Sequence, residues 1–358
     1  MTEKIKSYAT AEMKNLDKSR IEITGSIAPE TWEQFRAVAL KNINDTITVD
    51  GYRKGMVPEN ILVAKVGTMT ILEEMAELAL SQAYIDILID KSIEAIGKPE
   101  VKVTKLAEKN PLEFKITTAV VPTISLPDYK KIAATELKKN SKDEPDVTDA
   151  EVEEAVSRVR ASHVSHEGHD HDTMSAEEHD KMVKENLPDL TDSFVQGIGD
   201  FKDVTDFKTK LRGIIADNKK AEEREKTRIK IAAAISDATT IDLPEILVEG
   251  ELARTEARFE NDISRMGVKL ADYLAHAKKT MVDIRAEWRP HAEKKAKLQL
   301  VLNAIARQEK IAATAAEVEA EANHIIEHYK DADREQAEVY AETVLTNEKV
   351  FQFLESQK

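Results

Sequence analysis

The chain has 358 residues, of which 41% are hydrophobic and 33% are charged, and its formal net charge is −15 at pH 7. This length allows two or more domains with apolar cores of their own. The absence of cysteine excludes a disulfide framework and thiol catalysis.

The negative charge is unevenly distributed along the chain. Residues 1–130 carry a net charge of −2, and residues 131–358 carry the remaining −13. Because an acidic chain is repelled by nucleic acid, contact with RNA would need a local basic surface. The first residues lack the apolar stretch of a signal peptide, and no run approaches the roughly 20 apolar residues of a membrane span. We therefore expect a cytoplasmic protein that does not contact membranes.

The first third of the chain mixes strand and helix patterns. Residues 20–27 alternate apolar and polar side chains, as do residues 101–105 and 114–121, so we expect half-buried strands there. Apolar residues recur at helical spacing over residues 32–47 and 61–96. These patterns predict two helical stretches on either side of a short connection.

That connection is a glycine-punctuated basic loop, with the sequence Gly51-Tyr52-Arg53-Lys54-Gly55-Met56-Val57-Pro58. The glycines allow a tight tip, and the proline fixes a backbone angle that suits the start of a helix. An arginine fork, an ammonium group and an aromatic ring on this tip suit phosphate and nucleobase surfaces, or an acidic protein edge.

The loop and the order of the flanking elements resemble the ribosome-binding domain of bacterial trigger factor, whose signature is a Gly-Phe-Arg-Lys-Gly-Lys-Val-Pro type of loop. Residues 121–129, 187–194 and 240–247 also resemble segments of that family. The resemblance implies an α+β N-terminal ribosome-binding domain followed by a mostly all-α, elongated C-terminal chaperone domain with helical arms. The ribosome-binding residues that it implies are Gly51, Tyr52, Arg53, Lys54, Gly55 and Pro58.

The function that this resemblance implies is that of an ATP-independent chaperone. It would dock on ribosomal protein and rRNA near the exit tunnel and shield nascent polypeptides. No phosphate-binding loop, dinucleotide fingerprint or nucleophile elbow occurs in the sequence, and we expect no cofactor. The alternative is a ribosome-independent holdase or assembly chaperone. When it is not bound to the ribosome, the protein is expected to form a homodimer.

Two departures from the family pattern have consequences. Met56 stands where the family loop usually carries a second lysine, which removes one positive charge and lowers the expected ribosome affinity. The family usually inserts a prolyl-isomerase domain, but only residues 162–186 are available for it here. A segment below about 40 residues without cysteine or metal seldom folds alone. We therefore expect no enzymatic activity.

The expected domain order follows from these observations. Residues 1–126 form the ribosome-binding domain, and residues 127–161 form a linker strand and helix. Residues 162–186 form a flexible segment rich in histidine and acid, and residues 187–358 form the helical chaperone domain. From residue 148 onward the pattern is helical almost throughout, with capping boxes at 148–151 and 314–317.

Client binding would use apolar side chains on the helical domain that its own core leaves uncovered. The candidates are Phe259, Ile263, Met266, Met281, Phe351, Phe353 and Leu354. Each of them can equally fill the core of the domain, and the sequence does not separate the two roles.

The segment from His163 to Asp172 is the one feature that indicates a different kind of site. Its histidines alternate with carboxylates, a composition that suits zinc, nickel or copper. Weak metal-ligand candidates are His163, His166, His169 and His171. Because their spacing follows no settled ligand pattern, we interpret the segment as an acidic linker without a metal, and a metal-responsive regulator as the alternative.

Overall fold

The computed structural model describes residues 6–140, 146–164, 186–329 and 332–357. The chain divides into two compact units. One comprises Met1–Leu126 with Thr239–Ala304, and the other comprises Pro127–Ala238 with Ile305–Lys358. The units are interleaved along the sequence, and the consecutive domain order given above remains a prediction. As expected, a small N-terminal sheet is followed by a long helical region.

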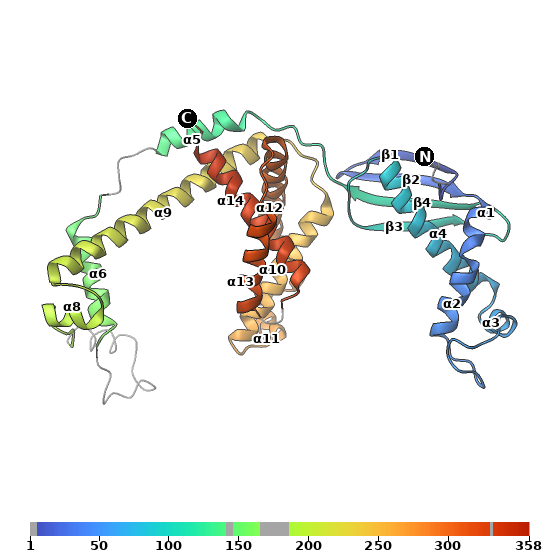
Figure 1. Ribbon diagram of the computed structural model, residues 1–358, viewed down its shortest axis with the longest axis horizontal. Coiled ribbons are helices and arrows are strands. Elements are labelled where there is room, and N and C mark those ends of the chain that lie inside the picture. Colours follow the sequence, from blue (N-terminus) through green and yellow to red (C-terminus); the bar gives the residue numbers. More distant parts are fainter. Residues whose placement is uncertain (1–5, 141–145, 165–185, 330–331, 358) are drawn as a thin grey trace. The chain divides into compact units, whose positions relative to one another are not determined.

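The first unit contains a four-stranded antiparallel sheet in the order β1-β2-β4-β3 (Figure 1). The strands are β1 (Thr10–Leu16), β2 (Arg20–Ile27), β3 (Ala95–Lys105) and β4 (Leu112–Val120). The strands predicted from alternation at 20–27, 101–105 and 114–121 are present as β2, β3 and β4. Strand β1 was not predicted, because an edge strand that is exposed on both faces has no apolar alternation.

Helices cover one face of this sheet. They are α1 (Pro29–Trp32), the 3-10 turn η1 (Glu33–Phe35), α2 (Arg36–Thr46), α3 (Glu59–Val66) and α4 (Thr68–Asp90). The core joins the inner side chains of β2 and β4, such as Ile23 and Phe114, to the buried face of α4. Trp32 is fully buried, and its indole Nε1 donates to the Asn110 carbonyl at 3.0 Å, which satisfies its polar group.

The apolar pattern of α4 was expected to run to residue 96, but the helix ends at Asp90. Ser92 has a φ of 53°, which an α-helix does not accommodate, and its amide bonds back to the Ile89 carbonyl at 3.2 Å. The apolar residues beyond this point therefore belong to β3, because a short apolar run fits either period.

The rest of the first unit is helical. It contains α10 (Glu245–Arg265), α11 (Leu270–Ala277) and most of α12 (Met281–Glu309). Helix α10 begins directly after Pro244, which is its N-cap residue. Val248, Leu252 and Ala292 form a small core between α10 and α12. Among the described residues, no helix combines the length and the apolar character that a membrane crossing requires.

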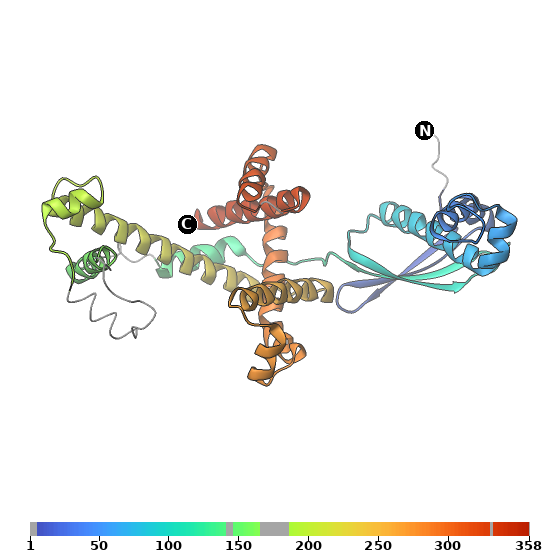
Figure 2. The same ribbon diagram turned by 90° about the horizontal axis from the view of Figure 1, so that it is seen from below.

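The second unit is built on α9 (Val204–Ala238), a single helix of 35 residues that is unbroken in both views (Figure 1, Figure 2). The helices α5 (Tyr129–Asn140), α6 (Asp149–Ala161), α8 (Asp192–Ile198) and α14 (Arg334–Glu355) contact it, and α13 (Ala315–His328) packs on α14. The two predicted capping boxes are present at the starts of α6 and α13.

A group of ion pairs joins α9 to α14. The guanidinium of Arg228 donates to both oxygens of Glu348 at 2.7 Å and to Glu355 at 2.7 Å, and Arg224 also donates to Glu355 at 2.6 Å. Burial by itself raises the pKa of Glu355, but the hydrogen bonds from Arg224 and Arg228 prevail and lower that pKa to about 2. The cluster is therefore charged at neutral pH.

Candidate functional site

The basic loop connects α2, which ends at Thr46, to α3, which begins at Glu59. Ile47 is the C-cap of α2 and is already extended, with its amide bonded to the Ile43 carbonyl at 2.9 Å. Pro58 is the N-cap of α3, and its carbonyl accepts the amides of Ile61 and Leu62. The two helix ends thus fix both ends of the loop.

Two successive β-turns form the tip. The Tyr52 amide donates to the Val49 carbonyl at 3.1 Å, and the Met56 amide donates to the Arg53 carbonyl at 3.0 Å. Gly51 and Gly55 occupy the third position of these turns, with φ values of 85° and 79°. A positive φ at that position is the requirement that glycine meets without steric cost. The sequence expectation of a tight glycine-dependent tip is confirmed.

Asn44 of α2 holds the base of the tip. Its side-chain Nδ2 donates to the Val57 carbonyl at 2.9 Å, and its Oδ1 accepts from the Val57 amide at 3.1 Å. The Asn44 carbonyl also accepts from the Gly55 amide at 3.0 Å. Val57 itself is buried in the core of the N-terminal region. Sequence reasoning missed Asn44, because its role depends on the loop folding back against the helix.

The side chains between these anchors are exposed. Tyr52 retains 40% of its accessible surface and Met56 retains 73%, and Arg53 and Lys54 are exposed as well. Neither cation forms an ion pair with another residue that the structure describes. The tip therefore presents two unneutralised cations, a ring and a thioether on a rigid turn, an arrangement that can bind phosphate or carboxylate groups and stack on a planar surface.

The seven candidate client contacts divide by burial. Ile263 and Leu354 are buried, so they fill the cores of their own units and are left out of any client surface. Phe259, Met281, Phe351 and Phe353 are partly buried, and the ring of Phe259 packs edge-on against Tyr273 and Trp288. Met266 is 71% exposed, which makes it the most accessible of the seven.

Other exposed apolar side chains on the helices were missed by the sequence analysis. They include Val268 just after α10, Tyr273 on α11, Val282 on α12, and Tyr329, Val339, Tyr340 and Val344 around α13 and α14. Neither the helical period nor the local composition distinguishes these residues from core positions.

The histidine segment contributes little to the described structure. His163 lies at the end of α6, where its Nδ1 is 2.9 Å from the Val159 carbonyl oxygen and its ring meets Phe194 edge-on. His166, His169 and His171 lie outside the described residues. Within the described ranges, no group of three or more histidine, aspartate or glutamate side chains is placed to hold a metal ion.

Two protein-family models match the N-terminal and the C-terminal parts of the chain. The family model described as bacterial trigger factor protein matches residues 9–159, and the model for its C-terminus matches residues 203–357. The residues between 159 and 203 lie outside both matches. Together the two models cover most of the chain.

Several curated relatives share this pattern. The trigger factor of Carboxydothermus hydrogenoformans is 24% identical, over 91% of this chain and 92% of its own length. The trigger factor of Halalkalibacterium halodurans is also 24% identical, over 93% of each chain. The first alignment runs over 401 positions, so the relative has residues with no counterpart in the 358 residues here.

A solved structure described as "Promiscuous Substrate Recognition in Folding and Assembly Activities of the Trigger Factor Chaperone" has the same fold. The TM-score is 0.56 at 16% identity, and the match covers 98% of this chain and all of that one. The likeness extends over the N-terminal sheet and the helical region alike.

Proposed function

This chain belongs to the bacterial trigger factor family and is a molecular chaperone, and we propose that it docks on the ribosome near the exit tunnel through the tip at residues 51–58. The observation that supports this docking most strongly is the geometry of the tip. Two glycine turns and the Asn44 clamp hold Arg53 and Lys54 outward without ion-pair partners among the described residues. A pre-ordered cationic tip loses little conformational entropy when it binds.

The chemistry of the docking surface follows from the distribution of charge. The chain is acidic overall, so long-range repulsion from RNA opposes binding everywhere except at a local basic surface. If the two cations neutralise two RNA phosphates, the affinity of the tip for RNA should fall about tenfold as the salt concentration rises from about 50 to about 200 mM. The proposed partners are rRNA and an acidic edge of a ribosomal protein, in the cytoplasm.

The helical region would shield nascent chains through dispersed apolar side chains. Met266 and the partly buried Phe259, Met281, Phe351 and Phe353 are retained as proposed client contacts, joined by Val282 and Tyr340. Each exposed contact offers on the order of one or two kcal/mol, so several of them hold an unfolded chain without fixing its conformation. No nucleotide is needed for such binding.

We further propose that the chain does not catalyse prolyl isomerisation. The family models leave residues 160–202 unmatched, and this stretch is the place where an inserted domain would be expected. The number of intervening residues is small for an independent domain.

Ribosome co-sedimentation tests the docking proposal. The double substitution of Arg53→Ala with Lys54→Ala should abolish pelleting with ribosomes. The matched control, Lys41→Ala with Lys65→Ala, removes the same charge from the exposed faces of the flanking helices α2 and α3 and should pellet normally. Pelleting of the tip variant at the wild-type level would refute docking through the tip and favour a ribosome-independent holdase.

A further inference from the structure

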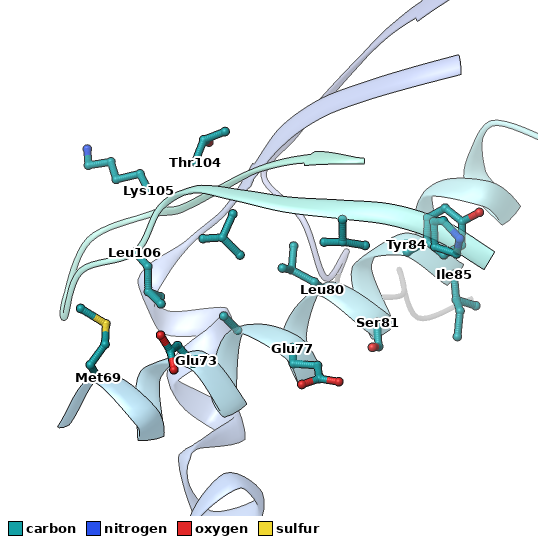
Figure 3. Close-up of a pocket in the computed structure, with 14 residues that line it drawn as sticks. Met69, Glu73, Glu77, Leu80, Ser81, Tyr84, Ile85, Thr104, Lys105 and Leu106 are labelled. Atoms are coloured by element: carbon teal, nitrogen blue, oxygen red, sulfur yellow. The ribbon is translucent and has the colours of Figure 1, made fainter. Parts of the chain in front are cut away.

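A groove lies on the N-terminal region, between α4 and the edge strand β3. Its cavity has a volume of about 860 Å³. Figure 3 shows Leu80 and Leu106 in the space between the helix and the strand, with Glu73, Glu77 and Ile85 along the helix at its margin. The groove is separate from the basic tip, because none of its lining residues belongs to the loop at 51–58.

The lining is apolar and open to solvent. Met69 and Ile85 on α4, and Val101 and Val103 on β3, retain between 43% and 56% of their surface. The two central strands, β2 and β4, bury their inward side chains beneath the helices, whereas the edge strand β3 does not. The groove is therefore a part of this helix-covered sheet face that the described chain leaves unfilled.

Charge at the margin indicates what the groove would accept. Glu73 and Glu77 lie one helical turn apart on α4, and both are exposed. Neither forms an ion pair with another described residue, whereas Lys105 on the opposite wall is paired with Glu113 at 3.4 Å. The net charge offered to an occupant is thus negative, and it favours a segment that carries lysine or arginine.

The dimensions suit an extended polypeptide. The lining on α4 runs from Met69 to Ile85, which spans about 24 Å at the helical rise of about 1.5 Å per residue. An extended chain covers that distance with about seven residues. Strand β3 is the edge of the sheet, so its outer side has no partner strand in the described chain, and an extended segment can align beside it.

We propose that this groove binds an extended segment of an unfolded polypeptide, with apolar side chains against α4 and β3 and a lysine or arginine opposite Glu73 and Glu77. The proposal rests on the chaperone function described above and adds a client site in the ribosome-binding region. Such a client site would lie on the same N-terminal region as the docking tip.

A site-specific fluorophore tests this occupant. Because the chain has no cysteine, Ser81→Cys places a single environment-sensitive label in the groove, and Met266→Cys places one on the helical region. The probe is a ten-residue unlabelled peptide of valine, phenylalanine and two lysines, compared with the same peptide carrying two glutamates instead. We expect the label at position 81 to respond saturably to the lysine peptide and about tenfold more weakly to the glutamate peptide.

Two variants of the labelled full chain locate the binding. Glu73→Lys with Glu77→Lys should lower the affinity for the lysine peptide by about tenfold and raise the affinity for the glutamate peptide. Glu30→Lys with Glu33→Lys is the matched control, since both are exposed carboxylates outside the groove, and it should leave both affinities unchanged. Val103→Glu places a charge in the apolar lining and should abolish the response of the label to the lysine peptide. Ile89→Glu, on α4 but outside the lining, should leave that response unchanged.

The outcomes separate this inference from the general chaperone function. A response at position 266 without one at position 81 would overturn the groove and leave client binding by the arms intact. If the protein also failed to suppress aggregation of an unfolded substrate, the chaperone function itself would fail. A response at position 81 that rises with protein concentration in the absence of peptide would identify a second copy of the chain as the occupant and overturn the proposal.

Discussion

Replacing Asn44 by alanine removes the clamp beneath the basic tip while leaving every tip side chain in place. The substitution deletes two hydrogen bonds, one to the carbonyl and one from the amide of Val57. Val57 is only 4% exposed, so water does not readily replace the lost partners. At about 0.5 to 1.5 kcal/mol per bond, the base of the loop should be destabilised by about 1 to 3 kcal/mol.

Amide hydrogen exchange measures this effect locally. The Val57 amide should exchange about five- to a hundredfold faster in Asn44→Ala, since about 1.4 kcal/mol corresponds to a factor of ten. Asn44→Asp keeps the acceptor for that amide and should retain most of its protection. Asn42→Ala removes only an exposed bond to Glu74, and it should leave the exchange of Val57 unchanged.

Ribosome affinity provides the functional readout. With the clamp removed, residues around the two turns must be ordered at the moment of docking, and we expect about a tenfold loss of affinity although Arg53 and Lys54 remain. If Val57 exchanges faster but ribosome affinity is unchanged, pre-ordering of the tip does not contribute to docking. If the exchange of Val57 is also unchanged, the clamp itself is absent.

Three further predictions concern charge and catalysis. Met56→Lys should strengthen ribosome binding and steepen its logarithmic salt dependence by about one unit, measured by co-sedimentation at several salt concentrations; an unchanged slope would place residue 56 away from phosphate. The folded pKa of Glu355, about 2, lies below its ordinary value of 4.5, so its contribution to stability is complete above that ordinary value and is lost as pH falls toward 2. Glu355→Gln should therefore lower the melting temperature at pH 7 and flatten its decline between about pH 5 and pH 2, followed by circular dichroism; parallel pH profiles would argue against the ion-pair cluster. In a peptide assay the full chain should not accelerate X-Pro isomerisation above its background of tens to hundreds of seconds, and a clear catalysed phase would refute the proposed lack of isomerase activity.

The sequence by itself determined those features whose causes are local. Turn chemistry placed a tight tip at Gly51 and Gly55, and positive φ angles are found at both. The capping boxes marked the starts of two helices correctly, because a helix end is specified by the few residues around it. The motif at residues 51–58 was also specific enough to indicate the family that the comparisons confirm.

The tertiary structure alone decided which apolar residues are covered. Ile263 and Met266 lie within one helical turn of each other, yet the first is buried and the second is exposed, because burial depends on neighbours that other elements supply. The Asn44 clamp and the groove between α4 and β3 also depend on contacts that only the folded chain makes. Each brings together residues that are distant in sequence, and no local pattern records which surfaces the folded chain leaves open.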